Sequence, residues 1–332
     1  MTLQTPVTFR PAIAPSGAAL PVPAPHPGRP GATPATGTIG APAHRQVRPR
    51  LFIDAQHGLG NRLRAIASAA TIAEATGREL VIVWQPDHHC QARFTDLFRY
   101  PGPVIETAFP GVFARAGGLL YNYMEIEPGA QKDAPILDEP ARHRGGDVYV
   151  RSAYRLVSPH RDITGERRFL QALRPVQDIA DMVRSVRRPN QVAAHVRMAG
   201  GPGFEHLSYE AAENWLPEGH ARIAHWRARS HARHFMARLD ALVAAGEAET
   251  IFLAADLPDT YARFADRYGP RLAWLPRRHY DRSAEQVRHA LADMLLLGTA
   301  ERLLGSYWSA FTDLAQRLSQ RVVRTEFCGR DF

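Results

Sequence analysis

The stretch that decides the fold is residues 51–55, LFIDA, together with the turn HGLGN that follows at residues 57–61. A short apolar run that ends in a glycine-rich turn predicts a buried strand. Small apolar residues then recur at helical spacing from Ala65 to Ala73, and Gly77 marks the expected end of a helix. A second apolar run, LVIVW at residues 80–84, completes a β-loop-α-β unit, which predicts a parallel sheet.

The same alternation returns in the second half of the chain. Residues 86–188 give only one clear strand, 148–151, and one helix, 169–186, whereas strands and helices alternate strictly afterwards. The predicted strands are 191–196, 250–254, 272–275 and 302–305, and the predicted helices are 224–245, 258–268, 284–297 and 308–318. This pattern is typical of a doubly wound α/β architecture. Two such halves would face a ligand cleft at the carboxyl ends of their strands.

The chain divides into three parts. Residues 1–49 hold 11 of the 26 prolines and almost no large apolar side chains, so they cannot bury enough surface to offset chain entropy. We expect a disordered arm there. Residues 50–188 and 189–332 are each expected to form a Rossmann-like domain.

The composition restricts the class of protein. Hydrophobic residues make up 45% and charged residues 22% of the chain, as in globular proteins. No run approaches the roughly 20 apolar residues that cross a bilayer, and the N-terminus lacks the apolar region of a signal peptide. The two cysteines, Cys90 and Cys328, lie far apart in sequence and favour a reducing compartment. We therefore expect a cytoplasmic protein with no membrane span.

The net charge of +8 would ordinarily indicate nucleic acid as a partner. Five arginines, however, lie in the first 50 residues, which contain no Asp or Glu, and they account for most of the excess. All basic residues except Lys132 are arginines, which is typical of an arginine-rich bacterial proteome. Because the folded part has no basic stripe with interleaved aromatic residues, we expect no nucleic-acid partner.

Three loops at predicted strand ends carry groups suited to an anionic ligand. In the first, Gly58, Gly60 and Asn61 allow close approach to the backbone at a helix N-terminus, and Arg62 adds a positive charge. The alternative is a plain strand-to-helix turn, because the sequence is neither a G-x-G-x-x-G nor a Walker motif.

The second loop begins with His195-Val196-Arg197 at a strand end and continues into a run of glycines. Alternation along the strand places His195 and Arg197 on the same face. Arg197 offers a fork for bidentate recognition of a phosphate, and His195 offers a hydrogen bond to a base or sugar. The alternative is a surface ion pair beside a hydrogen-bonded histidine.

The third loop runs from Asp293 to Phe311 and includes Ser306 and Ser309, which precede a predicted helix. A serine at this place is ordinarily an N-cap, but its hydroxyl and the helix N–H groups would equally hold a phosphate. Asp256, which follows a further predicted strand, adds a carboxylate.

Together these features resemble the GDP-fucose-dependent fucosyltransferase superfamily. They are the glycine-rich loop, the H-x-R at a strand end, the acidic residue after a strand, and an Asp-(apolar)-Gly segment that leads to Ser-x-x-Ser-x-Phe. The superfamily includes the nodulation and core α-1,6-, the α-1,2- and the protein O-fucosyltransferases. The resemblance covers roughly residues 51–318. It implies a GT-B architecture, with residues 50–188 on the acceptor side and residues 189–332 binding the nucleotide sugar, and inverting transfer without a metal or other cofactor.

The resemblance also implies roles for individual residues. Arg197 would bind the β-phosphate of GDP and stabilise the charge that develops as the sugar bond breaks. His195 and Asp293 would contact the guanine or its ribose, Ser309 would lie on the β-phosphate, and Asp256 would position Arg197 or contact the nucleotide. In all, the residues expected to bind the nucleotide sugar are Gly58, Gly60, Asn61, Arg62, His195, Asp256, Asp293, Ser306, Ser309 and Phe311.

The chain departs from the pattern H-x-R-R-x-D of several relatives. Met198 stands in place of the second Arg, and Gly200 stands in place of the Asp. This departure leaves open which group removes the proton from the acceptor hydroxyl. The nearest candidates follow the glycines and are otherwise ordinary surface residues, namely Glu205, His206 and Glu210.

Two other sequence features give weaker support for a functional site. His88-His89-Cys90 lacks the further ligands that a zinc site needs. Residues 226–234 are rich in Arg and His but lie on a predicted helix, so we interpret them as a solvated face rather than a docking face for an acidic acceptor.

The sequence therefore predicts an inverting glycosyltransferase that moves fucose from GDP-fucose to a hydroxyl of a glycan, peptide or other acceptor. Two alternatives stay open. One is an enzyme of the same fold that uses another nucleotide sugar, and the other is an inactive member that only binds nucleotide or glycan.

Overall fold

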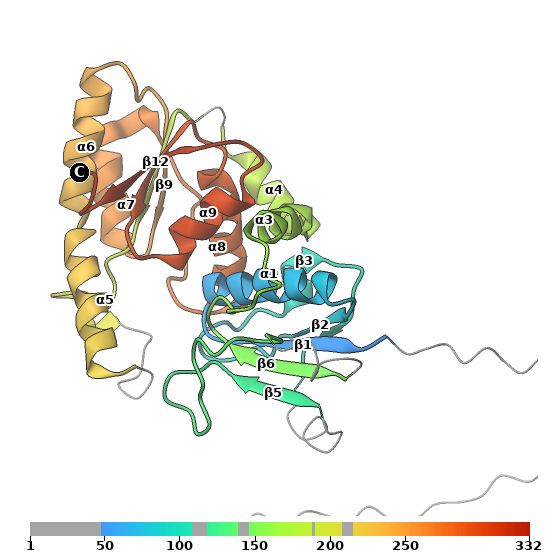
Figure 1. The fold of residues 1–332 in the computed structure, drawn as a ribbon. Coiled ribbons are helices and arrows are strands. Elements are labelled where there is room, and N and C mark those ends of the chain that lie inside the picture. Colours follow the sequence, from blue (N-terminus) through green and yellow to red (C-terminus); the bar gives the residue numbers. More distant parts are fainter. Residues whose placement is uncertain (1–47, 108–117, 139–145, 188–189, 208–214) are drawn as a thin grey trace, which may run out of the picture. The chain divides into compact units, whose positions relative to one another are not determined.

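The predicted β-loop-α-β unit lies at the centre of a five-stranded sheet in the computed structural model (Figure 1). The structure describes residues 48–107, 118–138, 146–187, 190–207 and 215–332. The predicted arm up to residue 47 and the base candidate Glu210 lie outside the described residues.

All neighbouring strands of this first sheet are parallel. Their order is β4 (Val104–Ile105), β2 (Glu79–Val83), β1 (Arg50–Ala55), β6 (Val148–Ser152) and β5 (Leu119–Asn122). The chain moves outward from β1 through β2 to β4, and later returns to the other side of β1. The loop after β1 therefore opens at the point where the strand order reverses, which is where ligands bind in open α/β sheets.

Two helices stand where the sequence predicted one helix over 169–186, so that prediction is wrong. They are α3 (Ile163–Ala172) and α4 (Gln177–Ser185), and the short strand β7 (Arg174–Pro175) separates them. Proline has no N–H to donate and biases the residue before it away from the helical conformation. β7 instead pairs antiparallel with β3 (Phe98–Arg99).

The second sheet is also parallel throughout. Its order is β10 (Leu272–Ala273), β9 (Ile251–Ala255), β8 (Val192–Val196), β11 (Arg302–Ser306) and β12 (Arg324–Cys328). The edge strand β12 was not predicted, because polar residues fill most of RTEFC. The strand order reverses between β8 and β11, so the loops that follow these two strands open apart.

The helices of the second half follow the prediction except at one point. The prediction of one helix over 224–245 is wrong, because two helices, α5 (Pro217–Arg229) and α6 (Ala232–Ala244), cover this segment. The His231 side chain accepts a hydrogen bond from the N–H of Arg233 and caps the new helix. The remaining helices are α1 (Leu59–Ala75), α7 (Pro258–Tyr268), α8 (Ala284–Leu297) and α9 (Ala310–Leu318), with 3-10 turns η1 (Phe94–Asp96), η2 (Glu205–Leu207) and η4 (Gly269–Arg271).

One apolar core joins elements of both sheets. Ile53 of β1 and Phe252 of β9 belong to it, together with Leu291 of α8 and Leu314 of α9, and all four are fully buried. Burial of each such side chain stabilises the fold by about 1.5–3 kcal/mol. Helix α9 contacts α1 and α3, and α8 contacts α4. Among the described residues, no helix has the length and apolar character required to cross a bilayer.

Candidate functional site

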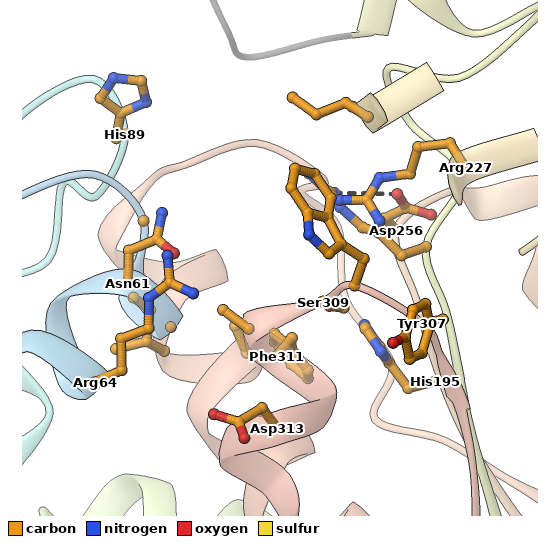
Figure 2. Close-up of a pocket in the computed structure, with 18 of the residues that line it drawn as sticks. Asn61, Arg64, His89, His195, Arg227, Asp256, Tyr307, Ser309, Phe311 and Asp313 are labelled. Atoms are coloured by element: carbon orange, nitrogen blue, oxygen red, sulfur yellow. Dashed lines mark hydrogen bonds and ion pairs between the residues drawn. The ribbon is translucent and has the colours of Figure 1, made fainter. Parts of the chain in front are cut away.

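The loops at the carboxyl ends of both sheets line one cleft of about 1010 Å³. Figure 2 shows side chains that enter it from α1 (Asn61), from the start of α9 (Ser309, Phe311) and from strand ends (His195, Asp256). The predicted residues that line the cleft are Gly58, Gly60, Asn61, His195, Arg197, Asp256, Asp293, Ser309 and Phe311. Residues far apart in the chain are therefore brought together as the sequence predicted.

The N-termini of α1 and α9 meet at this cleft. A Cβ atom on Gly60 would lie 3.2 Å from Cβ of Ala310, so position 60 has little room for a side chain. Neither N-cap residue, Gly58 or Ser309, forms a side-chain capping hydrogen bond. N–H groups at a helix start lack partners within the helix and carry partial positive charge. The two helix starts together therefore suit an anion such as a diphosphate.

Arg62 does not reach the cleft, and the structure corrects the prediction that it binds the nucleotide. Its side chain is fully buried. It donates from Nε to the carbonyl of His57 and from Nη1 to the carbonyl of Gln85, both at 2.7 Å, and its Nη2 lies 2.7 Å from Asp87. The guanidinium also lies over the ring of Trp84. Arg62 thus ties the first loop to the loop after β2.

Arg197 begins the second loop, and Asp256 holds it. Nη1 of Arg197 donates to the Asp256 carboxylate at 3.0 Å. The same carboxylate accepts from the backbone N–H groups of Met198 and Ala199 at 2.8–3.1 Å. The Arg197 side chain is 23% exposed and lines the cleft, so part of its five-donor fork stays open to a ligand. Asp256 therefore positions both the loop and the guanidinium.

His195 is held as a neutral imidazole in the wall of the cleft. Its Nδ1 lies 2.8 Å from Oγ1 of Thr312, and the ring of Phe311 stacks on it with centroids 4.6 Å apart. Burial, aided by the positive charges of Arg197 and Arg227, lowers the pKa of His195 to about 3. The imidazole therefore carries one proton and no charge at neutral pH.

Ser306 lies behind the cleft rather than in it. Its hydroxyl accepts from the backbone N–H of Arg197 at 2.9 Å and donates to the carbonyl of His195 at 3.0 Å, and the residue is fully buried. The structure thus corrects its predicted role in phosphate binding, because both interactions of the hydroxyl cross-link the ends of β8 and β11.

Asp293 lines the cleft but forms a buried, bidentate ion pair with Arg277. The guanidinium nitrogens lie 2.9 Å and 2.8 Å from the two carboxylate oxygens, and both side chains are at most 3% exposed. Burial lowers the pKa of Arg277 and the adjacent Asp293 raises it, with a net upward direction, whereas burial raises the pKa of Asp293. A ligand that contacts Asp293 would have to share it with Arg277.

An aromatic wall, formed by Tyr154, Trp215 and Trp308, borders the cleft. The ring centroid of Trp215 lies 6.5 Å from those of both other residues. Trp308 is 38% exposed and has φ of 54°, a left-handed conformation that bulky residues rarely adopt. The guanidinium of Arg222, on α5, lies over the Trp308 ring at 6.0 Å. This wall offers apolar ring faces beside positive charge.

The sequence pattern missed these aromatic residues and most of the cationic groups. Arg227 belongs to the run 226–234 that predicted a solvated helix face, yet it lines the cleft. Arginines are so frequent in this chain that no local signal marks the ones that face a ligand site. The other cations of the cleft wall are Arg64, Lys132, Arg155, Arg222, Arg277 and Arg282.

The segment after Arg197 explains the departures from the expected motif. Met198 is buried, and its sulfur accepts from the N–H of Ala232 at 3.2 Å, so it fastens the loop to α6. Gly200 has φ of 79°, which disfavours a larger residue there. Glu205 and His206 are exposed on η2 and do not line the cleft. The structure corrects their candidacy as general bases, because they lie outside its wall.

Metal ligands do not gather in the part of the chain that is described: no group of three or more His, Cys, Asp or Glu side chains is placed to hold an ion. At His88-His89-Cys90, the ring centroids of the two imidazoles lie 3.9 Å apart with their planes tilted by 39°, and burial raises the pKa of Cys90 to about 11. A thiol that resists ionisation is a poor metal ligand.

Searches against protein families and curated proteins find no match, but solved structures share the fold. The structure of NodZ α-1,6-fucosyltransferase soaked with GDP-fucose is similar over 83% of this chain and 95% of that one, with a TM-score of 0.51 and 19% identity. The structure of fucosyltransferase NodZ from Bradyrhizobium is similar over 83% of this chain and 96% of that one, with a TM-score of 0.50 and 17% identity. The structure of POFUT1 in complex with GDP-fucose is similar over 87% of this chain and 99% of that one, with a TM-score of 0.50 and 15% identity. The chain therefore has the GT-B-like α/β fold of these fucosyltransferases, which confirms the predicted fold class.

Proposed function

We propose that the protein is an inverting fucosyltransferase that uses GDP-fucose as its donor. The observation that carries the proposal is the convergence of the held Arg197, the neutral His195 and the two uncapped helix starts on one cleft. Each group suits one part of a nucleoside diphosphate. Proteins of the same fold have been crystallised with GDP and with GDP-fucose, which supports this choice of donor.

The cleft's own residues would serve each step of the transfer. The bond between fucose C1 and the β-phosphate oxygen breaks, GDP leaves with the electron pair, and the acceptor oxygen bonds to C1 from the opposite face. Negative charge grows on the β-phosphate, and Arg197 and the starts of α1 and α9 stabilise it. Asp256 keeps the guanidinium aimed at that charge. Because these groups neutralise the leaving group, we propose a reaction without a metal or other cofactor.

The acceptor hydroxyl must lose a proton in the same reaction. We propose that it binds along the aromatic wall and that a carboxylate of the cleft receives the proton. The carboxylates other than Asp256 and Asp293 that line the cleft are Glu125, Asp133, Glu218, Asp281 and Asp313.

Cys90 and Cys328 are free thiols, which supports the further proposal that the enzyme works in the cytoplasm.

Calorimetry with GDP, UDP and ADP, combined with an assay of GDP-fucose hydrolysis, tests the proposal. We expect selective binding of GDP and slow release of fucose to water. Selective GDP binding without turnover would favour a binding protein, and turnover with another nucleotide sugar would replace the donor. The variant Arg197→Ala, in which the cleft lacks its central cation, serves as the inactive control.

A further inference from the structure

A chain of hydrogen bonds behind the cleft ends at the imidazole of His195. Nδ1 of His195 lies 2.8 Å from Oγ1 of Thr312, which itself donates to the carbonyl of Ser306 at 3.1 Å. The Ser306 hydroxyl in turn donates to the carbonyl of His195. All three residues are buried. The interactions therefore join β8, β11 and α9 at one point.

The direction of these bonds follows from the number of protons. A hydroxyl has one proton, and a carbonyl oxygen can only accept. A Thr312 proton that is donated to the carbonyl of Ser306 leaves the Thr312 oxygen as an acceptor for Nδ1–H of His195. The neutral imidazole has only one N–H, so its Nε2 carries a lone pair.

The lone pair of Nε2 is available to a ligand. Within the described part of the chain, the imidazole forms no other hydrogen bond. His195 is only 4% exposed, yet it lines the cleft, and the ring of Phe311 stacks on it with an angle of 14° between the two ring planes. An N–H or O–H group of a ligand in the cleft can therefore donate to it.

We propose that Thr312 is a positioning residue that fixes the tautomer of His195 and thereby makes Nε2 a strict acceptor for an N–H or O–H group of the bound nucleotide. The identity of this ligand rests on the proposed function, whereas the tautomer does not. Guanine offers N–H donors and ribose offers O–H donors. A nucleotide that presents an acceptor at this point would leave two lone pairs facing each other and would be rejected.

Two substitutions separate the hydroxyl of Thr312 from its shape. Thr312→Val keeps the branched side chain and removes the hydroxyl, whereas Thr312→Ser keeps the hydroxyl and removes the methyl. The methyl packs against Gly305, where a Cβ atom would lie 2.2 Å from it. The pair of variants therefore distinguishes the hydrogen bond from packing.

The first measurement is nitrogen NMR of the ligand-free full chain, with the signals of His195 assigned by comparison with His195→Asn. We expect protonated Nδ1 and bare Nε2 in the native protein and in Thr312→Ser, and loss of the Nδ1–H preference in Thr312→Val. Bare Nδ1 in the native protein would overturn the proposal. This measurement holds even if GDP does not bind, an outcome that would refute only the proposed function.

The second measurement is calorimetry with GDP, inosine diphosphate and 2′-deoxy-GDP. Thr312→Val should weaken GDP binding at least about tenfold, or about 1.4 kcal/mol, and Thr312→Ser less than about threefold. In the native protein one analogue should bind about tenfold more weakly than GDP. Inosine diphosphate, which lacks the 2-amino group, reports on the base, and 2′-deoxy-GDP reports on the ribose.

The ratio between the affinities for GDP and for the weaker analogue would not change if Thr312 only supported the fold, so this ratio tests its effect on the His195 tautomer. In Thr312→Val the difference between GDP and the weaker analogue should shrink to less than about threefold. Unchanged GDP affinity and unchanged discrimination in Thr312→Val would overturn the proposal. If Thr312→Val fails to fold, as judged by its melting temperature, Thr312→Ala provides the same comparison without the branched side chain.

Discussion

Replacement of Arg197 by lysine separates stabilisation of the leaving group from simple binding of GDP. Lysine keeps the positive charge but has one compact ammonium in place of a planar fork. In the structure, Nη1 donates to Asp256 at 3.0 Å while the side chain also lines the cleft. A single ammonium cannot both keep the bond to this carboxylate and direct further donors at the proposed site of the β-phosphate. The variant therefore keeps the positive charge of Arg197 and loses the fixed orientation of its N–H donors.

The magnitude follows from what each state of the reaction requires. Loss of one donor to a developing oxyanion costs about 2.7–4 kcal/mol, on the order of 10²–10³ in turnover. The ground state keeps its ion pair with the diphosphate, so GDP affinity should fall less than about tenfold, or about 1.4 kcal/mol. We thus expect Arg197→Lys to lower kcat at least about 10²-fold, and Arg197→Ala to abolish detectable turnover.

The assay is steady-state hydrolysis of GDP-fucose, which needs no acceptor, with calorimetry of GDP binding on the same preparations. Arg330→Lys is the matched control, because Arg330 pairs with Asp331 and does not line the cleft. Near-native turnover in Arg197→Ala would refute the reasoning. Equal losses of rate and affinity in Arg197→Lys would also refute it, since they would mean that the residue binds both states alike.

Three further predictions concern the ion pair, pH and metal. Asp293→Asn leaves Arg277 buried without its anion, which should lower the free energy of unfolding by about 3–5 kcal/mol. Because each kcal/mol corresponds to about 2–4 °C in a protein of this size, the melting temperature should fall by at least about 6 °C. An unchanged melting curve would contradict this prediction. The pKa of His195 is lowered from 6.5 to about 3, so between these values the unfolded chain binds more protons than the folded one, and the contribution of this residue to stability is lost as pH falls. His195→Asn should therefore flatten the dependence of the unfolding free energy on pH in this range by up to one proton, which denaturant titrations at several pH values measure. Hydrolysis of GDP-fucose should survive excess EDTA, and a loss that Mg²⁺ restores would remove the proposed mechanism.

Local periodicity determined most of the secondary structure. The sequence predicted α7 and α8 with the boundaries that the structure has, and β1, β2 and β8 within one residue at each end. Strands and helices depend on side chains two to four residues apart, so a short window contains the information needed. The two missed helix breaks, at Pro175 and His231, depend on a strand partner and on a side-chain cap.

The three predicted loops all contribute residues to one cleft, because the carboxyl ends of parallel strands meet at one edge of a sheet. What the sequence could not decide was which polar side chains face the cleft. Arg62 and Arg197 are both arginines beside a glycine-rich turn, but Asp87 and two carbonyl groups hold Arg62 in the interior, whereas Asp256 holds Arg197 at the wall. Similarly, Ser306 is buried while Ser309 lines the cleft.

The sequence by itself determined a parallel α/β architecture and the three loops that line the cleft, because both follow from short-range patterns of apolar and small residues. Only the tertiary structure decided the partners of those loops. The hydrogen bond between His195 and Thr312 joins residues 117 positions apart, and the ion pair of Arg197 with Asp256 spans 59. No spacing rule connects such residues, since their contact depends on how whole strands and helices pack. Protonation, burial and access to the cleft are consequences of that packing.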